Sequence, residues 1–374
     1  KHLFQGSAAA ILGIFVPIFL YETFGQEFHY VGLYYALIAL LFVIFLVPAM
    51  HISNRIGFTK SLILAGFFNI IVFSIMYYLT PGNLDILVGF LLVAITGFKV
   101  FHWVPYNVDF TLFTTKEDRG RQVSLTFATT AFLGIIGPII GGYVIVNSGY
   151  NILFSIAVIL LIVSTISYIF VPETNTNYDW SFMETWKKFF SRKYRPMMVS
   201  EFASGAEATV SIVVWPIFLY DLLSGDVLEI GALSAVIVSA TIIIQLFIGN
   251  RFDLHGLSKK RTLQIGSSLY ALGWIIKIFI LSAAHVFFVG LFHNLARIFT
   301  KTPFMAIMYD MSGDQGDYVD EFTVLRELAL HMGKIFSLLA ISVLTLFIPL
   351  AWTFMIAAIA SIALNFIHSS HSAK

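Results

Sequence analysis

Long apolar runs dominate this sequence and restrict what it can fold into. Stretches of about 20 residues with almost no charge, long enough to cross roughly 30 Å of hydrocarbon as a helix, recur along the whole 374-residue chain. The chain is 58% hydrophobic and 11% charged, whereas a soluble domain carries about 25% charged residues. Such a chain has too little polar surface to face water on all sides. We therefore expect an all-α membrane protein rather than a large soluble helical one.

Turn signals between the apolar runs predict twelve transmembrane helices. We place the spans at 4–24, 28–52, 60–80, 85–113, 122–147, 150–171, 198–222, 228–250, 261–283, 286–311, 322–347 and 350–369. A polar connector at 173–197 separates the first six from the last six. This pattern predicts an N-terminal bundle at 1–172 and a C-terminal bundle at 198–374.

The distribution of Lys and Arg predicts the orientation of these spans. Loops on one side of the expected membrane are basic except for the acidic loop 312–321, whereas those on the other side contain Asp and Glu but no Lys or Arg. Because cytoplasmic loops carry the excess of basic residues, we expect both termini and the connector to be cytoplasmic.

The connector contains a predicted amphipathic helix. Ser181 and Glu184 have the spacing of a capping box. Apolar side chains then form a stripe beside a basic face: Trp180, Met183, Trp186, Phe190 and Tyr194. This pattern is typical of a helix at the membrane surface, but a simple tether between the two bundles would also fit it.

An internal repeat relates the two bundles. The run PIFLY from Pro17 to Tyr21 recurs from Pro216 to Tyr220, and Gly32 matches Gly231 at the same offset. The offset covers an even number of spans, so both copies have the same orientation. Two parallel halves related by an axis along the membrane normal form a known transporter design, in which the substrate site lies between the halves near the midplane.

Several short motifs, in order along the chain, resemble those of the major facilitator superfamily. The first two are loops after the second span of each half, and the third is the approach to the fifth helix. Their residues are Asn54, Arg55, Gly57 and Lys60 in the first loop, Gly249, Asp253 and Gly256 in the second, and Arg119 and Arg121 in the third. The first loop departs from the family pattern, because Met50 and Asn54 replace the expected Gly and Asp.

The fifth span has a glycine motif of the same family, made of Gly137, Pro138, Gly141 and Gly142, and Pro172-Glu173-Thr174 follows the sixth span as in that family. Glycines let helices approach closely in lipid, and proline bends a helix. We assign the residues of the three loop motifs and of the glycine motif to structure or gating rather than to substrate contact. The resemblance implies two pseudo-symmetric six-helix bundles, alternating access and a monomer in the plasma (bacterial inner) membrane. It implies a small-molecule substrate and no cofactor.

Ionisable residues inside the spans are the candidates for function. Each costs about 2.5–3.5 kcal/mol at a helix centre, so it usually faces a cavity or a partner. They gather on one face of three spans: Lys99, His102, Tyr106 and Asp109 in span four, His293, Arg297 and Lys301 with nearby Asn294 in span ten, and Glu327, His331 and Lys334 in span eleven. Glu207 is in span seven and Lys277 in span nine.

The resemblance implies that spans one, four, seven and ten line the central cavity. Lys99, Glu207, Arg297 and Lys301 would then face it, whereas Lys277 would snorkel toward the extracellular interface. Trp215 could stack on a ligand or simply pack in the core.

The basic stripe of span ten favours an anionic ligand, because no acidic residue on that helix face neutralises it. We hypothesise that Arg297 and Lys301 bind a carboxylate, phosphate or sulfate. Two alternatives remain: permanent salt bridges to Glu207 and Glu327, or a role in gating alone. The second half contains most of these charges, so we expect it to hold the ligand while the first half closes over it.

Proton coupling is a second hypothesis. A buried carboxylate can carry a proton through alternating access, and the candidates are Asp109, Glu207 and Glu327. Each could instead only compensate a neighbouring cation.

Other function classes have weaker support. An exporter or flippase of amphipathic drugs or lysolipids would suit the Phe-rich spans, and a membrane scaffold or receptor is a further alternative.

The chain contains no His-Glu-x-x-His, Gly-x-Ser-x-Gly or Gly-x-x-x-x-Gly-Lys-[Ser/Thr] motif, so we expect neither an enzyme nor an ATP-driven pump. We expect no metal site, since there is no cysteine and no two histidines share a helix at ligand spacing. A net charge of +1 argues against a nucleic-acid partner.

Overall fold

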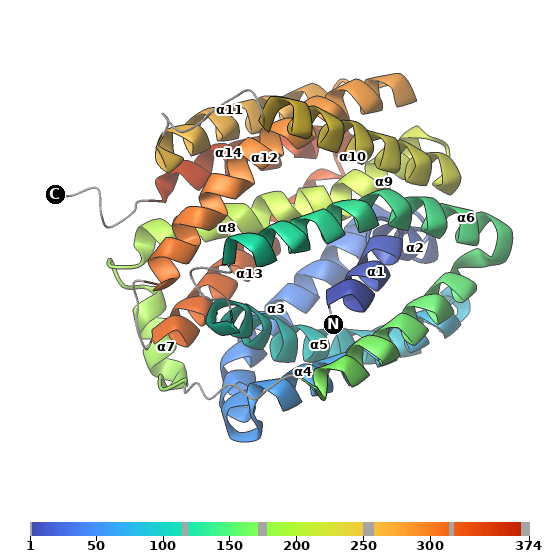
Figure 1. Cartoon of the computed structure of the whole chain (residues 1–374). Helices are drawn as coiled ribbons and strands as arrows, with labels where there is room; N and C mark the ends of the chain where they lie inside the picture. Colours follow the sequence, from blue (N-terminus) through green and yellow to red (C-terminus); the bar gives the residue numbers. More distant parts are fainter. Residues whose placement is uncertain (1, 114–118, 171–177, 250–257, 314–317, 368–374) are drawn as a thin grey trace.

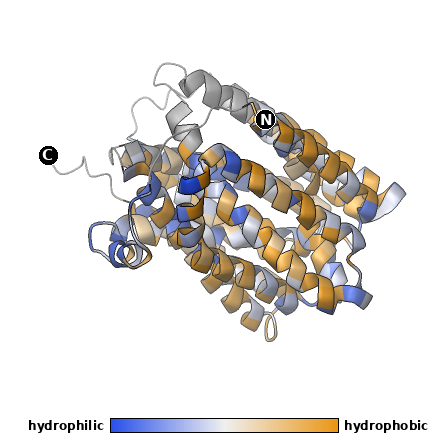
Figure 2. Cartoon of the chain, turned by 90° about the horizontal axis from the view of Figure 1, so that it is seen from below, coloured by the Kyte–Doolittle hydropathy of each residue, from blue (hydrophilic) through white to orange (hydrophobic). Residues whose placement is uncertain are grey.

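The computed structural model describes residues 2–113, 119–170, 178–249, 258–313 and 318–367. Within these ranges the ordered elements are helices, and none is a β-strand (Figure 1). Hydrophobic residues predominate along the long helices (Figure 2), and many large apolar side chains are exposed on the outside. This is the surface that a bilayer requires, and it confirms the predicted all-α membrane fold.

The helices follow the expected spans to within a few residues. The first part of the chain forms α1 (His2–Leu12), α2 (Phe15–Thr23), α3 (Phe28–Ile56), α4 (Phe58–Tyr78), the short 3-10 helix η1 (Pro81–Asn83), α5 (Leu84–Phe113) and α6 (Arg119–Tyr168). The second part forms α7 (Phe182–Phe189), α8 (Arg195–Thr209), the π-helical segment η2 (Val210–Val214), α9 (Trp215–Leu222), α10 (Val227–Gly249), α11 (Lys259–Lys277), α12 (Ala283–Gly313), α13 (Val319–Leu344) and α14 (Phe354–Ala363). The 3-10 turn η5 (Leu350–Thr353) precedes α14, and the 3-10 turn η6 (Leu364–Phe366) follows it.

The number of spans depends on how broken helices are counted. In the described ranges eight helices are long and apolar enough to cross a membrane, or nine if α1 and α2 form one bent span. Gly149 has non-helical torsion angles inside α6 and divides this 50-residue helix in two. The total reaches twelve only with three additions to these nine. The two parts of α6 must count as two spans, and α11 and the shorter segment Leu350–Phe366 must each count as one. The count of twelve therefore stays a prediction.

The repeated PIFLY run follows a break in the helix in both copies. Pro17 lies just after the 46° bend between α1 and α2. Pro216 lies just after the π-helical segment η2. Proline has no N–H, and its ring clashes with the carbonyl four residues earlier, so neither helix continues regularly. The same residue produces a bend in one copy and a wider helical turn in the other.

Two helix pairs join the two parts of the chain. α3 packs against α13, and α10 packs against α6. In the predicted numbering, the second span of each half therefore packs against the fifth span of the other. The two pairings are related to each other as the two copies of the internal repeat are, and the bundle boundaries themselves stay a prediction.

The glycine motif of α6 permits its close packing. A Cβ atom on Gly137 would lie 2.6 Å from the backbone of Ala10 in α1, and one on Gly142 would lie 2.8 Å from the carbonyl oxygen of Val227 in α10. A Cβ on Gly231 would clash with the carbonyl of Pro138. Small residues at these positions let the backbones touch, which drives helix association in lipid.

The connector helix α7 forms where the sequence predicts it. Ser181 is its N-cap, and the Ser181 hydroxyl accepts a hydrogen bond of 3.2 Å from the Glu184 backbone N–H. Trp180 and Tyr194 are buried in the protein core, whereas Met183 and Phe190 are exposed. The predicted apolar stripe is thus shared between protein packing and the outer surface.

The chain just before α7 links α3 to α13. The Asn54 amide donates to the Tyr178 carbonyl at 2.9 Å, and the Asp179 backbone N–H donates to the Glu321 carboxylate at 2.9 Å. Asn54 belongs to α3 and Glu321 to α13. The connector therefore contacts both parts of the protein at one membrane face.

Candidate functional site

Two groups of polar residues lie among the apolar helices. The first, which we call the Glu207 cluster, consists of Glu207, Tyr270, Lys277, Arg297 and Lys301, with the aromatic rings of Trp215, Trp274 and His293 around them. The second, the Glu327 cluster, consists of Lys99, Asn107, Glu327, His331 and Lys334. The first comes from α8, α9, α11 and α12, whereas the second comes from α5 and α13.

A buried ion pair forms the centre of the Glu207 cluster. Glu207 is 1% exposed, and its Oε2 atom lies 2.7 Å from the Lys301 Nζ atom. The Tyr270 hydroxyl donates to the other carboxylate oxygen at 2.6 Å. The Lys301 ammonium also donates to the Ser204 hydroxyl at 3.4 Å. Both carboxylate oxygens therefore have partners, and the salt bridge that the sequence left as an alternative is present for Lys301.

Arg297 lies one helical turn before Lys301 on α12 and is exposed. It forms no ion pair with any residue that the structure describes. Its charge is nevertheless close enough to act on Glu207 and Tyr270. Its guanidinium is therefore the cation of this cluster that is most available to a ligand.

Lys277 is buried, which shows that the expected snorkelling is wrong. Only 4% of the residue is exposed, and its Nζ atom lies 3.7 Å from the centroid of the Trp215 ring and 4.2 Å from that of Trp274. Aromatic faces attract a desolvated cation, so the two tryptophans hold the ammonium inside the protein. One use of the Trp215 ring is therefore to contact Lys277.

His293 completes the aromatic side of this cluster. It is 3% exposed, and its ring lies 4.4 Å from that of Tyr270 and 4.5 Å from that of Trp274. Neither ring nitrogen has a hydrogen-bond partner among the described residues. Asn294, next to it, is half-buried.

The Glu327 cluster is held by longer contacts. The Asn107 amide donates to the Glu327 carboxylate at 3.4 Å, and the His331 Nδ1 atom lies 3.7 Å from the other carboxylate oxygen. The same Nδ1 atom is 2.9 Å from the Glu327 backbone carbonyl oxygen. The Phe42 ring of α3 stacks on His331 with centroids 3.7 Å apart. Contacts from α3 and α5 therefore meet α13 at this point.

Two lysines face Glu327 without forming a close ion pair with any described residue. The charges of Lys99 on α5 and Lys334 on α13 both act on the Glu327 carboxylate, and they act on each other. The structure thus brings together Lys99 and Lys334, which the sequence places in different halves.

Other predicted residues are scattered. His102 is buried, and its ring stacks on that of Tyr106 with centroids 5.3 Å apart. The His102 Nε2 atom lies 3.1 Å from the Gln5 amide nitrogen.

Among the predicted gating residues Arg55 and Lys60 are exposed, and Gly57 joins α3 to α4 with a φ angle of +90°. Glycine adopts that angle without the strain that other residues incur.

Some predicted residues cannot be compared with the structure. Asp253 and Gly256 lie outside the described residues. The same holds for the side chains of Asp109, Arg119 and Arg121, although their backbones belong to α5 and α6. Gly249 is the last residue of α10.

The sequence reasoning missed several buried polar residues. Arg326 and Glu201 form an ion pair of 2.9 Å between α13 and α8. Both residues lie inside expected spans. Because ionisable groups are costly in a membrane and usually have a partner or a function there, their positions in the sequence were a sufficient signal to select them. Gln5 accepts a 2.9 Å hydrogen bond from the Tyr168 hydroxyl, and for these uncharged residues no comparable signal exists. Among the described residues, no group of three His, Asp or Glu side chains could hold a metal ion.

Three comparisons place the chain among known proteins. The family model described as Major Facilitator Superfamily matches residues 2–200. The uncharacterized protein YqgE of Bacillus subtilis (strain 168) is 22% identical over 284 residues, which are 72% of this chain and 65% of that relative. The chain thus spans just under two thirds of the relative's length. The crystal structure of a POT family transporter in complex with 5-aminolevulinic acid is similar with a TM-score of 0.64 and 12% identity, and the match covers 97% of this chain and 92% of that one. At this identity the similarity concerns the fold.

Proposed function

Because the chain belongs to the major facilitator superfamily, we propose that it is a secondary active transporter that moves a small anionic solute by alternating access. Alternating access requires two bodies that move against each other around a central site. The pairings of α3 with α13 and of α10 with α6 provide the surfaces between such bodies.

The main support for an anionic substrate is the excess of positive charge in the Glu207 cluster. Arg297 and Lys301 share the single carboxylate of Glu207 among the described residues. Charges inside a membrane protein are costly unless they are paired. An anionic group would complete this cluster, which supports a substrate with a carboxylate or phosphate.

Arg297 is the residue that we assign to direct contact with the substrate. Lys301 already binds Glu207, and Lys277 lies between two tryptophans. A guanidinium also presents two parallel N–H groups that fit a carboxylate or phosphate. The structural neighbour was solved with 5-aminolevulinic acid, a small zwitterion that carries a carboxylate beside its amino group, and only the carboxylate is relevant to the proposed contact with Arg297.

We assign proton coupling to Glu327 rather than to Glu207. Both oxygens of Glu207 have short contacts, whereas Glu327 has contacts of 3.4 and 3.7 Å that join α13 to α5 and to its own neighbour His331. A carboxylate that is loosely held between two moving bodies can exchange its partners, and with them a proton, during the cycle.

A transport assay tests this proposal. The purified protein is reconstituted into liposomes and supplied with radiolabelled carboxylates, organic phosphates, neutral sugars and cations under a pH gradient. We expect uptake of an anion, and we expect Arg297→Gln to lower it at least about tenfold, since a charge-assisted pair to a carboxylate contributes about 1.5–3 kcal/mol. The matched control is Arg192→Gln, which removes an exposed arginine of the connector. Transport of a neutral or cationic solute that is insensitive to Arg297→Gln would contradict the proposal.

A further inference from the structure

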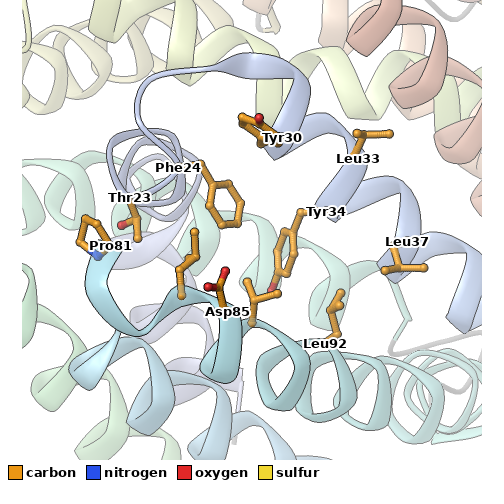
Figure 3. A pocket seen from close by; sticks show the side chains of 11 residues that line it. Thr23, Phe24, Tyr30, Leu33, Tyr34, Leu37, Pro81, Asp85 and Leu92 are labelled. Atoms are coloured by element: carbon orange, nitrogen blue, oxygen red, sulfur yellow. The ribbon is translucent and has the colours of Figure 1, made fainter.

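A separate pocket of about 510 Å³ lies between the end of α2, the first turns of α3 and the start of α5 (Figure 3). The far end of α3 contacts the connector through Asn54, so the pocket lies at the membrane face opposite to α7. Its volume falls within the roughly 300–1,000 Å³ of ligand pockets. It is distinct from both charged clusters, because none of their residues lines it.

The pocket opens toward the bilayer. Its wall includes Leu33 and Leu37, which are 48% and 40% exposed, and Leu40 and Ile44 continue the same exposed stripe at helical spacing along α3. An exposed stripe of large aliphatic side chains on a membrane helix faces lipid. Tyr30, also in the wall, is exposed, and an aromatic ring of this kind is typical of the level of the lipid headgroups.

Two polar groups mark one end of the pocket. Asp85, in the first turn of α5, is exposed, and its carboxylate has no ion pair or hydrogen bond with a described residue. The Tyr34 hydroxyl is buried and has no partner in the described part of the chain, and the residue is only 6% exposed. Figure 3 shows that both oxygen-bearing ends point into the same side of the pocket. A buried hydroxyl without a partner is unfavourable, so this site is incomplete.

We propose that the pocket binds a membrane phospholipid whose headgroup carries a primary ammonium, such as phosphatidylethanolamine. The ammonium would donate to the Asp85 carboxylate, and the Tyr34 hydroxyl would donate to a phosphate or ester oxygen. An acyl chain would lie along Leu33, Leu37 and Leu92. Among the described residues that line the pocket none is Lys or Arg, so the site attracts a cationic group and disfavours a purely anionic headgroup.

The bound lipid would stabilise the arrangement in which α2 and α9 are joined at this membrane face. Thr23 and Phe24 line the pocket, and they directly follow the residues that join the two parts of the protein here. The Tyr220 hydroxyl donates to the Glu22 carboxylate at 2.6 Å, and the Tyr21 hydroxyl donates to the Asp221 carboxylate at 3.3 Å. A ligand that binds one conformer better than another shifts the equilibrium toward it.

Native mass spectrometry of the detergent-solubilised protein tests the proposal. The protein is titrated with phosphatidylethanolamine, phosphatidylcholine and phosphatidylglycerol of the same acyl chains, and the fraction with one bound lipid is measured. We expect phosphatidylethanolamine to bind best and Asp85→Asn to weaken it about fivefold, the effect of one exposed ion pair of about 1 kcal/mol. The matched control is Glu229→Gln, which removes an exposed carboxylate from the first turn of α10 outside the pocket.

Two further measurements separate a phospholipid from other occupants. Tyr34→Phe should weaken phosphatidylethanolamine but not dodecylammonium, which has no phosphate to accept the hydroxyl proton. Asp85→Glu should restore most of the lipid binding that Asp85→Asn loses. Equal binding of the three phospholipids, or unchanged phosphatidylethanolamine binding in Asp85→Asn, would overturn the proposal. Phosphatidylethanolamine binding that Tyr34→Phe leaves unchanged, together with displacement of the lipid by dodecylammonium at equal concentration, would show that the occupant is a free cationic amphiphile instead.

Discussion

The two charged clusters contain the same kinds of residue, yet they are built differently. In the Glu207 cluster the carboxylate has contacts of 2.6 and 2.7 Å, and all members come from helices of the second part of the chain. In the Glu327 cluster the carboxylate has contacts of 3.4 and 3.7 Å, and its neighbours come from both α5 and α13. A tight group on one body moves with that body. A loose group between two bodies must change whenever they move.

This difference suggests a division of labour that rests on the proposed transport cycle. The Glu207 cluster would keep its geometry and hold the substrate, whereas the Glu327 cluster would report and control the relative position of the two bodies. Stability measurements and distance measurements distinguish the two roles, because the first cluster should affect mainly folding and the second mainly the balance of conformers.

The largest effect is expected from Glu207→Gln. The change leaves the Lys301 ammonium without its carboxylate inside the protein, and breaking a buried ion pair typically costs about 3–5 kcal/mol. We expect about 3 kcal/mol, because the Lys301 side chain is 25% exposed. Thermal unfolding in detergent measures the loss. The double variant Glu207→Gln/Lys301→Met is the control and should regain most of the stability. A cost below about 1 kcal/mol would show that the pair is not a rigid element.

Glu327→Gln should have a smaller effect on stability and a clear effect on conformation. Without the carboxylate, Lys99 and Lys334 repel each other across the boundary between α5 and α13. We expect the balance of conformers to shift by about 1–2 kcal/mol, within the usual range of coupling energies. The chain has no cysteine, so spin labels at Ile52→Cys and Arg261→Cys report the distance between the two bodies.

The same variant tests proton coupling in the transport assay. Uptake by Glu327→Gln should lose its dependence on the pH gradient, whereas uptake by Arg192→Gln should keep it. If Glu327→Gln kept both the wild-type distribution of spin-label distances and the wild-type pH response of uptake, the Glu327 cluster would have no role in the transport mechanism.

The smallest effect is expected from Asn107→Ala. Its amide makes a hydrogen bond of only 3.4 Å to Glu327, and such a bond contributes at most about 0.5–1 kcal/mol. The spin-label distances should therefore shift in the direction of Glu327→Gln, but by less. A shift larger than that of Glu327→Gln would reverse the order of importance within the cluster.

The sequence alone was sufficient for the class of fold and for most helix positions. Apolar runs of membrane length can only be helices or closed barrels in lipid, because every backbone polar group must find a partner within the chain. The repeated PIFLY run and the glycines of the fifth span predicted the relation between the two parts and the close helix packing that α6 shows. These features depend on local composition and spacing, which a sequence displays directly.

Only the tertiary structure decided which charges meet. The spacing of Arg297 and Lys301 on one helix predicts a basic stripe, but it does not show that Glu207 neutralises Lys301 and leaves Arg297 exposed. The burial of Lys277 between Trp215 and Trp274 depends on three residues that approach from two helices. Helical periodicity fixes the face on which a residue lies, but the rotation of each helix about its axis and the identity of its neighbour are set by packing across the whole bundle.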